Sequence, residues 1–160
     1  MKKILTLVCM LMLGVSVSNA QTQQGETAAG INLVYGSEIK SMGLGARFQY
    51  GILDQLRAEV GFNGFFQHDH KSWWDVNINA HYLFNLRHEQ LYIYPIAGLN
   101  YTMKNDKKEK DEDNHIGLNL GAGIEYEFTE HWGANLEYRH TIIRGDLDQG
   151  VFGLGVNYKF

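Results

Sequence analysis

The feature of this sequence that most constrains its fold is an alternation of apolar and polar residues that recurs in eight segments. It is clearest from Ile116 to Phe128, where every second residue is apolar and the positions between are glycine, asparagine or glutamate. A two-residue period is that of a pleated β-strand, and no stretch after Gln21 shows the period of an amphipathic helix. The sequence therefore predicts strands at Thr27–Tyr35, Ser41–Tyr50, Gln55–Phe66, Trp73–Phe84, Leu91–Met103, His115–Phe128, Trp132–Ile143 and Val151–Phe160.

The connections between these segments alternate in length. Short turns at one end and longer, more polar loops at the other are typical of an up-and-down barrel that crosses a bacterial outer membrane, with the turns on the periplasmic side. An even number of strands also places both termini on the short-turn side. The short connections are Ile52–Asp54, Leu86–Gln90 and Thr129–His131, the longer ones are Gln67–Ser72, Lys104–Asn114 and Arg144–Gly150, and the first, Gly36–Lys40, is modest.

The residue composition of the two faces of the predicted strands indicates which face points outward. A soluble lipocalin-like barrel, the alternative, would place large apolar side chains inside and charges outside. Here the polar face is rich in glycine, which suits a narrow interior, and the aromatic residues of the apolar face gather near the strand ends in two belts, as at membrane interfaces. We therefore predict an all-β fold, an eight-stranded antiparallel up-and-down transmembrane β-barrel in the outer membrane.

The first twenty residues differ from the rest. A basic start at Met1–Lys3, an apolar run over Ile4–Val17 and small residues at Ser18–Ala20 predict a cleaved, Sec-type signal peptide at 1–20, followed by the barrel domain at 21–160. The only cysteine, Cys9, lies inside the apolar run. Cleavage removes two of the 14 basic residues and leaves 12 basic against 18 acidic residues. This formal net charge of −6 argues against a nucleic-acid partner.

With these features, the chain resembles the small outer-membrane barrels of the OmpA/OmpX type. The resemblance implies that Gly155, Tyr158 and Phe160 belong to the signal that such proteins present to the barrel-assembly machinery, while Gly153 departs from the polar residue usual at the start of that signal. It also implies periplasmic chaperones and outer-membrane lipids with lipopolysaccharide as partners. We expect a monomer without a cofactor.

Charged residues at inward positions form the first candidate site. An eight-stranded interior is just wide enough to be filled by side chains, and isolated charges are unfavourable there. We therefore expect a salt-bridged and hydrogen-bonded plug, and a gated proton or ion path is the alternative. The nine predicted residues are Arg47, Arg57, Glu59, Asp75, Glu125, Glu127, Glu137, Arg139 and Lys159.

Histidines form the second candidate, because His68, His70, His115 and His140 could converge on the outer rim. A metal site there is a weak hypothesis, since no cysteine and no fixed ligand spacing supports it, and we predict no metal. His140 also raises the alternative of a lipid A-modifying enzyme, because lipid A deacylases place a His-x-Ser pair on a late strand. Ile142 stands at the serine position here, so we predict no catalytic residue and no enzymatic activity.

Two local features complete the prediction. Lys104–Asn114 carries charges of both signs without an apolar anchor, which indicates a solvated loop, and it lacks the glycine and oxygen spacing of a calcium loop. Pro95 removes a ladder donor inside the fifth strand, so we expect a bulge or local irregularity there.

The predicted function is that of a non-enzymatic outer-membrane barrel serving envelope integrity or surface interaction; the alternatives are a narrow pore and a lipid A-modifying enzyme.

Overall fold

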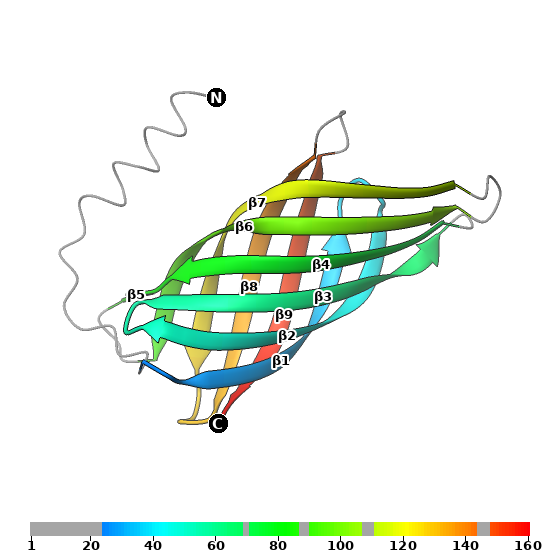
Figure 1. The fold of residues 1–160 in the computed structure, drawn as a ribbon. Helices are drawn as coiled ribbons and strands as arrows, with labels where there is room; N and C mark the ends of the chain where they lie inside the picture. Colours follow the sequence, from blue (N-terminus) through cyan, green and yellow to red (C-terminus); the bar gives the residue numbers. More distant parts are fainter. Residues whose placement is uncertain (1–23, 69–70, 87–89, 107–110, 144–147) are drawn as a thin grey trace.

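The structure, a computed structural model, consists of long β-strands (Figure 1), and it describes residues 24–68, 71–86, 90–106, 111–143 and 148–160. The predicted signal peptide, at 1–20, lies entirely outside these residues. In the part of the chain that is described, no helix is long and apolar enough to cross a membrane. The strands are β1 (Thr27–Gly36), β2 (Ser41–Leu53), β3 (Leu56–His68), β4 (Lys71–Tyr82), β5 (Phe84–Asn85), β6 (Leu91–Asp106), β7 (Asp111–Glu127), β8 (Trp132–Ile143) and β9 (Gln149–Lys159).

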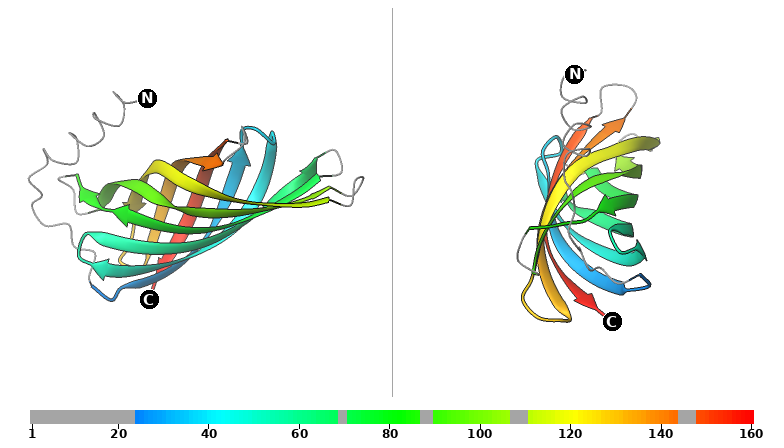
Figure 2. Two further views of the ribbon diagram at one scale, coloured as in Figure 1. Left: turned by 45° about the horizontal axis from the view of Figure 1, so that its top comes forward. Right: turned by 90° about the vertical axis from the view of Figure 1, so that its left-hand side faces the viewer.

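The strands close into a barrel. Each long strand pairs antiparallel with the next one along the chain, and β1 pairs with β9, so that the sheet joins itself. β4 and the two-residue β5 both pair with β6 and act as one interrupted strand. Figure 2 shows the strands curving around a common interior. The prediction of a closed, eight-stranded antiparallel barrel is therefore confirmed.

Pro95 explains the interruption between β4 and β5. The β4–β6 ladder ends at the pair His81 and Ile96, and the β5–β6 ladder resumes at the pair Phe84 and Ile93. The two ladders keep the same register, and Pro95 still pairs with Ala122 on the other side. Since proline has no N–H to donate, the predicted irregularity takes the form of lost pairing on one side of β6, without a bulge in its register.

The alternation in the sequence separates the two surfaces of the wall. Large apolar side chains cover the outside, and Ile31 and Ile116 each expose 72% of their area. The inside is lined by buried asparagines, arginines and carboxylates. An apolar exterior of this kind is stable only in a hydrocarbon environment, whereas the polar interior satisfies its groups by hydrogen bonding.

Two apolar clusters inside the barrel are departures from this alternation. One consists of Leu83, Tyr92, Tyr94 and Ile96, which lie around the interruption near the short-turn end. The other consists of Val34, Phe65 and Val151, packed against Ile39 and Trp73 near the opposite end. The polar network described below therefore lies between two patches of apolar packing.

The prediction of a loop over Lys104–Asn114 is wrong for most of its length. β6 continues to Asp106 and β7 begins at Asp111, and the two remain paired throughout; only residues 107–110 lie outside the described residues. The backbone hydrogen bonds between β6 and β7 continue into this charged segment, so a charged composition does not by itself end a strand. The ladder between β7 and β8 begins only at Gly117, so the β6–β7 hairpin projects beyond that part of the wall (Figure 1).

Candidate functional site

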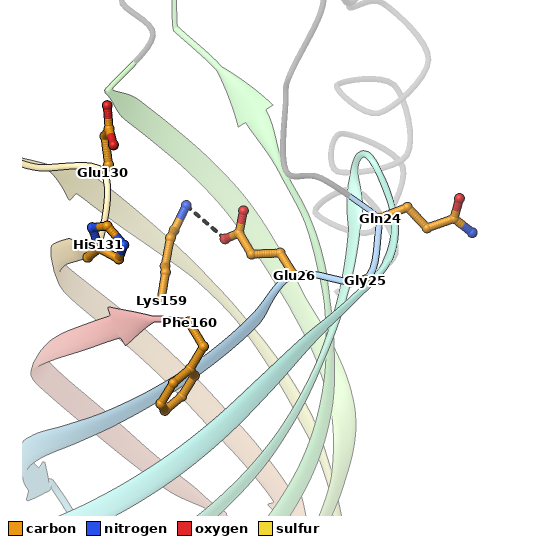
Figure 3. Close-up of a pocket in the computed structure, with 7 residues that line it drawn as sticks. All are labelled: Gln24, Gly25, Glu26, Glu130, His131, Lys159 and Phe160. Carbon is orange, nitrogen blue, oxygen red and sulfur yellow. Dashed lines mark ion pairs between the residues drawn. The ribbon is translucent and has the colours of Figure 1, made fainter.

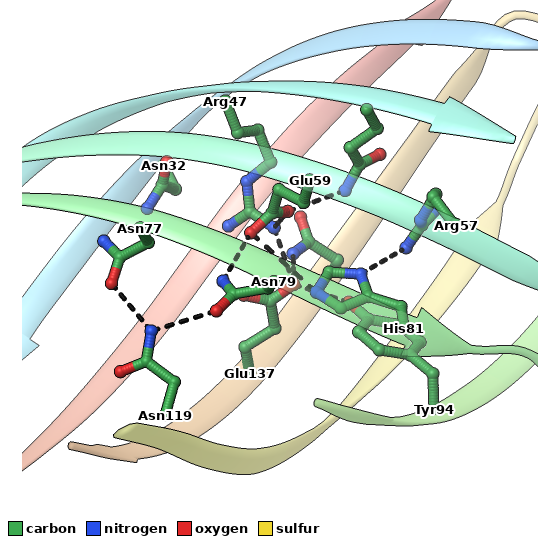
Figure 4. Close-up of polar contacts among 12 residues, drawn as sticks. Asn32, Arg47, Arg57, Glu59, Asn77, Asn79, His81, Tyr94, Asn119 and Glu137 are labelled. Carbon is green, nitrogen blue, oxygen red and sulfur yellow. Dashed lines mark hydrogen bonds and ion pairs between the residues drawn. The ribbon is translucent and has the colours of Figure 1, made fainter. Parts of the chain in front are cut away.

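Arg47 is the centre of the first group of contacts inside the barrel (Figure 4). Its Nη1 atom donates to Glu59 Oε2 at 3.2 Å and to Glu137 Oε1 at 2.6 Å. The three residues come from β2, β3 and β8, and alternation turns each of them inward. Tyr94 adds a hydroxyl hydrogen bond of 2.7 Å to the same oxygen of Glu137. Arg47 thus connects walls that are distant in the sheet order.

A second ion pair crosses the interior between β3 and β7. Arg57 and Glu125 form two parallel hydrogen bonds of 3.1 and 3.0 Å, the bidentate geometry that orients a guanidinium and a carboxylate most firmly. Asn157 on β9 donates to the same carboxylate at 3.2 Å. Because these strands are not neighbours in the sheet, their side chains occupy the lumen itself.

Asparagine side chains continue the network around Asp75. This carboxylate accepts hydrogen bonds from Asn63 at 2.6 Å and from Asn77 at 2.5 Å, while Arg139 Nη2 lies 4.0 Å away. Asn119 on β7 donates to the side-chain oxygens of Asn77 and Asn79 on β4, each at 2.9 Å. Amides that donate and accept at once can bridge such strands without adding charge.

The structure places His81, which the sequence analysis did not single out, next to the Arg47 group. Its Nε2 atom lies 3.8 Å from Glu59 Oε1, and its ring stacks on Tyr94 with centroids 4.8 Å apart. Potential ligand atoms of Glu59, His81 and Glu137 lie within 4.8 Å of one another and could in principle hold a metal ion. Arg47 already contacts both carboxylates, however, so a guanidinium fills the position that a cation would take.

The buried charges of the described interior do not balance. Three arginines, at 47, 57 and 139, face four carboxylates, at 59, 75, 125 and 137. His81 does not supply the missing positive charge, because Arg57 Nη2 lies 3.4 Å from His81 Nδ1 and a guanidinium can only donate, so the imidazole accepts there in its neutral form. The alternation already marks this position as inward, because Asp75, Asn77 and Asn79 precede it at two-residue spacing.

Two of the nine predicted charges, Glu127 and Lys159, lie apart from this network at the short-turn rim. Lys159 forms an ion pair with Glu127 and another, of 2.9 Å, with Glu26 (Figure 3). A cavity of about 520 Å³ opens beside them and is also lined by His131 and Phe160. The structure therefore divides the predicted charges between the barrel interior and its inner rim.

The three residues of the predicted assembly signal, Gly155, Tyr158 and Phe160, do not share one face of the barrel wall. Gly155 points inward, and a Cβ atom there would lie 2.7 Å from Asn135 Oδ1. Tyr158 is on the outer surface, where its ring packs 5.0 Å from that of Trp132 and 5.3 Å from that of Phe160. Their role in assembly stays a prediction.

The predicted histidine cluster is represented in part. His70 lies outside the described residues, and only the backbone of His68 is described. His140 is on the outer surface with Nε2 3.7 Å from Asp148 Oδ2, while Thr141 turns inward and donates to Asn119 at 2.7 Å. Ile142, which stands where a lipid A deacylase would need its serine, lies on the outer surface.

Solved structures of similar fold support this architecture. The N-terminal β-barrel domain of Pseudomonas aeruginosa OprF matches with a TM-score of 0.73 and 20% identity, covering 86% of this chain and 98% of that domain. Ail of Yersinia pestis, in complex with the heparin analogue sucrose octasulfate, matches with a TM-score of 0.66 and 15% identity, covering 86% and 100%. Identities this low establish the shared fold alone.

Sequence comparison points the same way. The uncharacterized outer-membrane protein y4mB of Sinorhizobium fredii is 30% identical over 86 residues, which cover 40% of this chain and only 38% of that protein's length. A family model, the outer membrane protein beta-barrel domain, matches residues 5–160. The chain therefore belongs to the outer membrane protein beta-barrel domain family and is a barrel protein of the bacterial outer membrane.

Proposed function

We propose that this protein acts at the cell surface, as a non-enzymatic barrel that presents its β6–β7 hairpin to a partner outside the membrane. The observation that carries this proposal is the length of the hairpin. Its ladder runs out to the pair Asp106 and Asp111, whereas β8 reaches β7 only as far as the pair Ile143 and Gly117. The hairpin thus extends past β8 on one side, while β4 stays paired with β6 on the other side as far as the pair Lys71 and Asp106. A paired element of this kind is better suited to contact than a flexible loop, because less conformational freedom is lost on binding.

Charge narrows the class of partner. Residues 104–114 contain four lysines and five acidic residues, so the hairpin carries charges of both signs and almost no net charge. The Ail structure holds a heparin analogue, which is a polyanion. A polyanion favours an excess of basic residues, so we propose a protein partner with mixed surface charge for this chain instead.

The interior supports a role without conduction. Arg57 and Glu125 pair across the lumen, Arg47 joins three strands, and apolar clusters lie towards both ends. We expect the refolded protein to give no conductance above background in planar bilayers. A stepwise current that disappears in the Arg57→Met variant would instead favour the narrow pore.

The hairpin can be tested by replacing residues 104–113 with Asn-Gly, a two-residue turn that connects the paired positions Met103 and Asn114. We expect the shortened barrel to fold and to reach the outer membrane, while adhesion of the bacteria to immobilised host proteins falls to the level of a deletion strain. A matched control keeps the length and composition of residues 104–113 but scrambles their order.

Two outcomes would contradict the proposal. Unchanged adhesion after shortening would remove the hairpin as the contact surface. If the deletion strain becomes permeable to detergent and the shortened protein fully restores the barrier, the barrel serves envelope integrity. Unchanged lipid A mass spectra in the deletion strain would support the absence of lipid-modifying activity.

A further inference from the structure

The polar cavity of about 520 Å³ at the short-turn rim opens where the first and last strands of the barrel meet (Figure 3). Its walls come from segments that are distant in the sequence. Glu26 lies just before β1, and Lys159 is the last residue of β9. Glu130 and His131 come from the turn between β7 and β8. The cavity therefore lies across the β1–β9 contact that closes the barrel.

The charges around this cavity do not balance. Lys159 forms ion pairs with Glu127 and, at 2.9 Å, with Glu26. Glu130 forms no ion pair within the described part of the chain (Figure 3). Three carboxylates thus face one ammonium group, and a protonated His131 would still leave the set one positive charge short. An additional cation is therefore favoured at this rim.

The start of the mature chain is a source of such a cation. Cleavage after Ala20, which the sequence predicts, turns the backbone nitrogen of Gln21 into a primary ammonium group, whereas the precursor has an uncharged amide there. Residues 21–23 lie outside the described part of the chain, and Gln24 lines the cavity. Since three residues span at most about 10 Å, the new ammonium group cannot move far from the cavity.

The point from which this segment departs is fixed by backbone hydrogen bonds. The Gly25 N–H donates to the carbonyl oxygen of Gly51 at 2.9 Å, and the Gly51 N–H donates to that of Glu26 at 2.8 Å. Gly25 has a φ of 91°, in the left-handed region that favours glycine, and the chain turns there beside the cavity. A fixed point of departure reduces the conformational freedom that is lost on binding.

We propose that the ammonium group of Gln21, created by cleavage of the signal peptide, binds in this cavity and pairs with Glu130. The pair joins the segment before β1 to the β7–β8 turn, on the far side of β9. It is an ion pair across the closing contact of the barrel that the precursor cannot form, because its amide nitrogen carries no charge. The inference rests on cleavage after Ala20 and is independent of the contact surface proposed for the outer hairpin.

Carbodiimide crosslinking of the processed protein, purified from outer membranes, tests this pair, because the reagent joins an amine to a carboxylate that it touches. We expect peptide mass spectrometry to find an amide between the α-nitrogen of Gln21 and the carboxylate of Glu130. Crosslinks from Lys159 to Glu26 and to Glu127 are the positive control, because both ion pairs are present in the structure. The protein unfolded in urea should give none of the three.

Glu130→Gln removes the carboxylate with little change of shape, and it should abolish the Gln21 crosslink. It should also lower the pKa of the α-amino group by about 0.2–0.7, the range of an exposed ion pair. The measurement is NMR titration of the protein with a ¹³C-dimethylated amino terminus. Glu38→Gln, in the outer connection between β1 and β2, is the matched control and should leave both results unchanged.

Four results would overturn the proposal. They are a processed chain that begins at another residue, a Gln21 that has cyclised to pyroglutamate and lost its amine, a crosslink from Gln21 to Asp54 in the β2–β3 turn in place of Glu130, and an α-amino pKa that is the same in Glu130→Gln as in the wild type. An amine from outside the chain is the competing occupant. Equimolar trilysine that crosslinks to Glu130 in the wild type would show that Gln21 leaves the cavity open, and would also count against the proposal.

Discussion

At the scale of single residues, the barrel depends on a few side chains that connect distant strands. Arg47 is the clearest of them, because it holds Glu59 and Glu137 together from its position on β2. Both carboxylates are almost completely buried, so neither can be screened by bulk water once the guanidinium is removed. Buried charges of this kind are tolerated only while they are paired.

We expect Arg47→Met to destabilise the barrel by about 3–5 kcal/mol, because it leaves two buried carboxylates without their cation. Urea-induced unfolding in detergent, followed by tryptophan fluorescence, measures the change. The triple variant Arg47→Met, Glu59→Gln, Glu137→Gln removes the charges together and should recover most of the loss. A single substitution that leaves the unfolding midpoint unchanged would show that Arg47 does not bear on stability.

Glycines on the inner face differ sharply in the space around them. A Cβ atom at Gly98 would overlap the carbonyl oxygen of Ile78 and lie 2.7 Å from the Cα atom of Asn79, both backbone atoms of β4. At Gly61 the nearest heavy atoms are 3.9 Å away. We therefore expect Gly98→Ala to cost about 1–3 kcal/mol and Gly61→Ala to be nearly neutral. Equal unfolding midpoints for the two variants would contradict this prediction.

At the scale of elements, the interruption between β4 and β5 is the weak point of the wall. β4 and β5 pair with β6 in the same register, so the backbones on both sides of the gap are already aligned for pairing. What the gap lacks is the N–H donor that Pro95 cannot supply. Leu83 lies at this gap and turns into the lumen, where it packs with Tyr92, Tyr94 and Ile96. The inner apolar cluster thus compensates in packing for ladder bonds that the wall does not form.

Pro95→Val should close this gap by restoring an N–H and a residue with high strand propensity. We expect slower amide exchange at Tyr82, which lies opposite position 95 in the shared register, and a gain in unfolding free energy of about 0.5–1.5 kcal/mol, the range of one hydrogen bond. Ala97→Val, at the next outward position of β6, is the control, because its ladder to Ala80 is already complete. Faster exchange in Pro95→Val than in the wild type would contradict this account.

At the scale of the whole molecule, the two-residue period predicted most of the architecture. It located eight strands and their outward faces, because burial in a thin wall depends directly on alternation. It could not predict the inner apolar clusters, since Leu83 and the run from Tyr92 to Ile96 place apolar residues on both faces. It also missed the long β6–β7 hairpin, because the charged residues of 104–114 interrupt the apolar alternation while the backbone pairing continues through them.

Closure of the barrel can be tested with a disulfide across β1 and β9. Leu33 and Leu154 are register partners on the outer face, so Leu33→Cys with Leu154→Cys should crosslink on oxidation, given the short distance between paired Cβ atoms. The crosslinked protein should keep an altered gel mobility after heating until it is reduced. Leu33→Cys with Ile78→Cys, on strands that do not pair, should remain free. Failure of the first pair to form a bond would count against the β1–β9 contact.

That same contact has a consequence for how the protein folds. The other long strands meet along hairpins, whereas Ala28 pairs with Lys159, 131 positions away. Pairing across such a separation carries the largest loop-closure entropy in the molecule, so it is expected to form late and to limit the folding rate. Until then β1 and β9 present two unpaired edges, the surfaces on which chains aggregate. The time spent open, more than the stability of the closed state, would then determine how much of the protein is lost before it reaches its membrane.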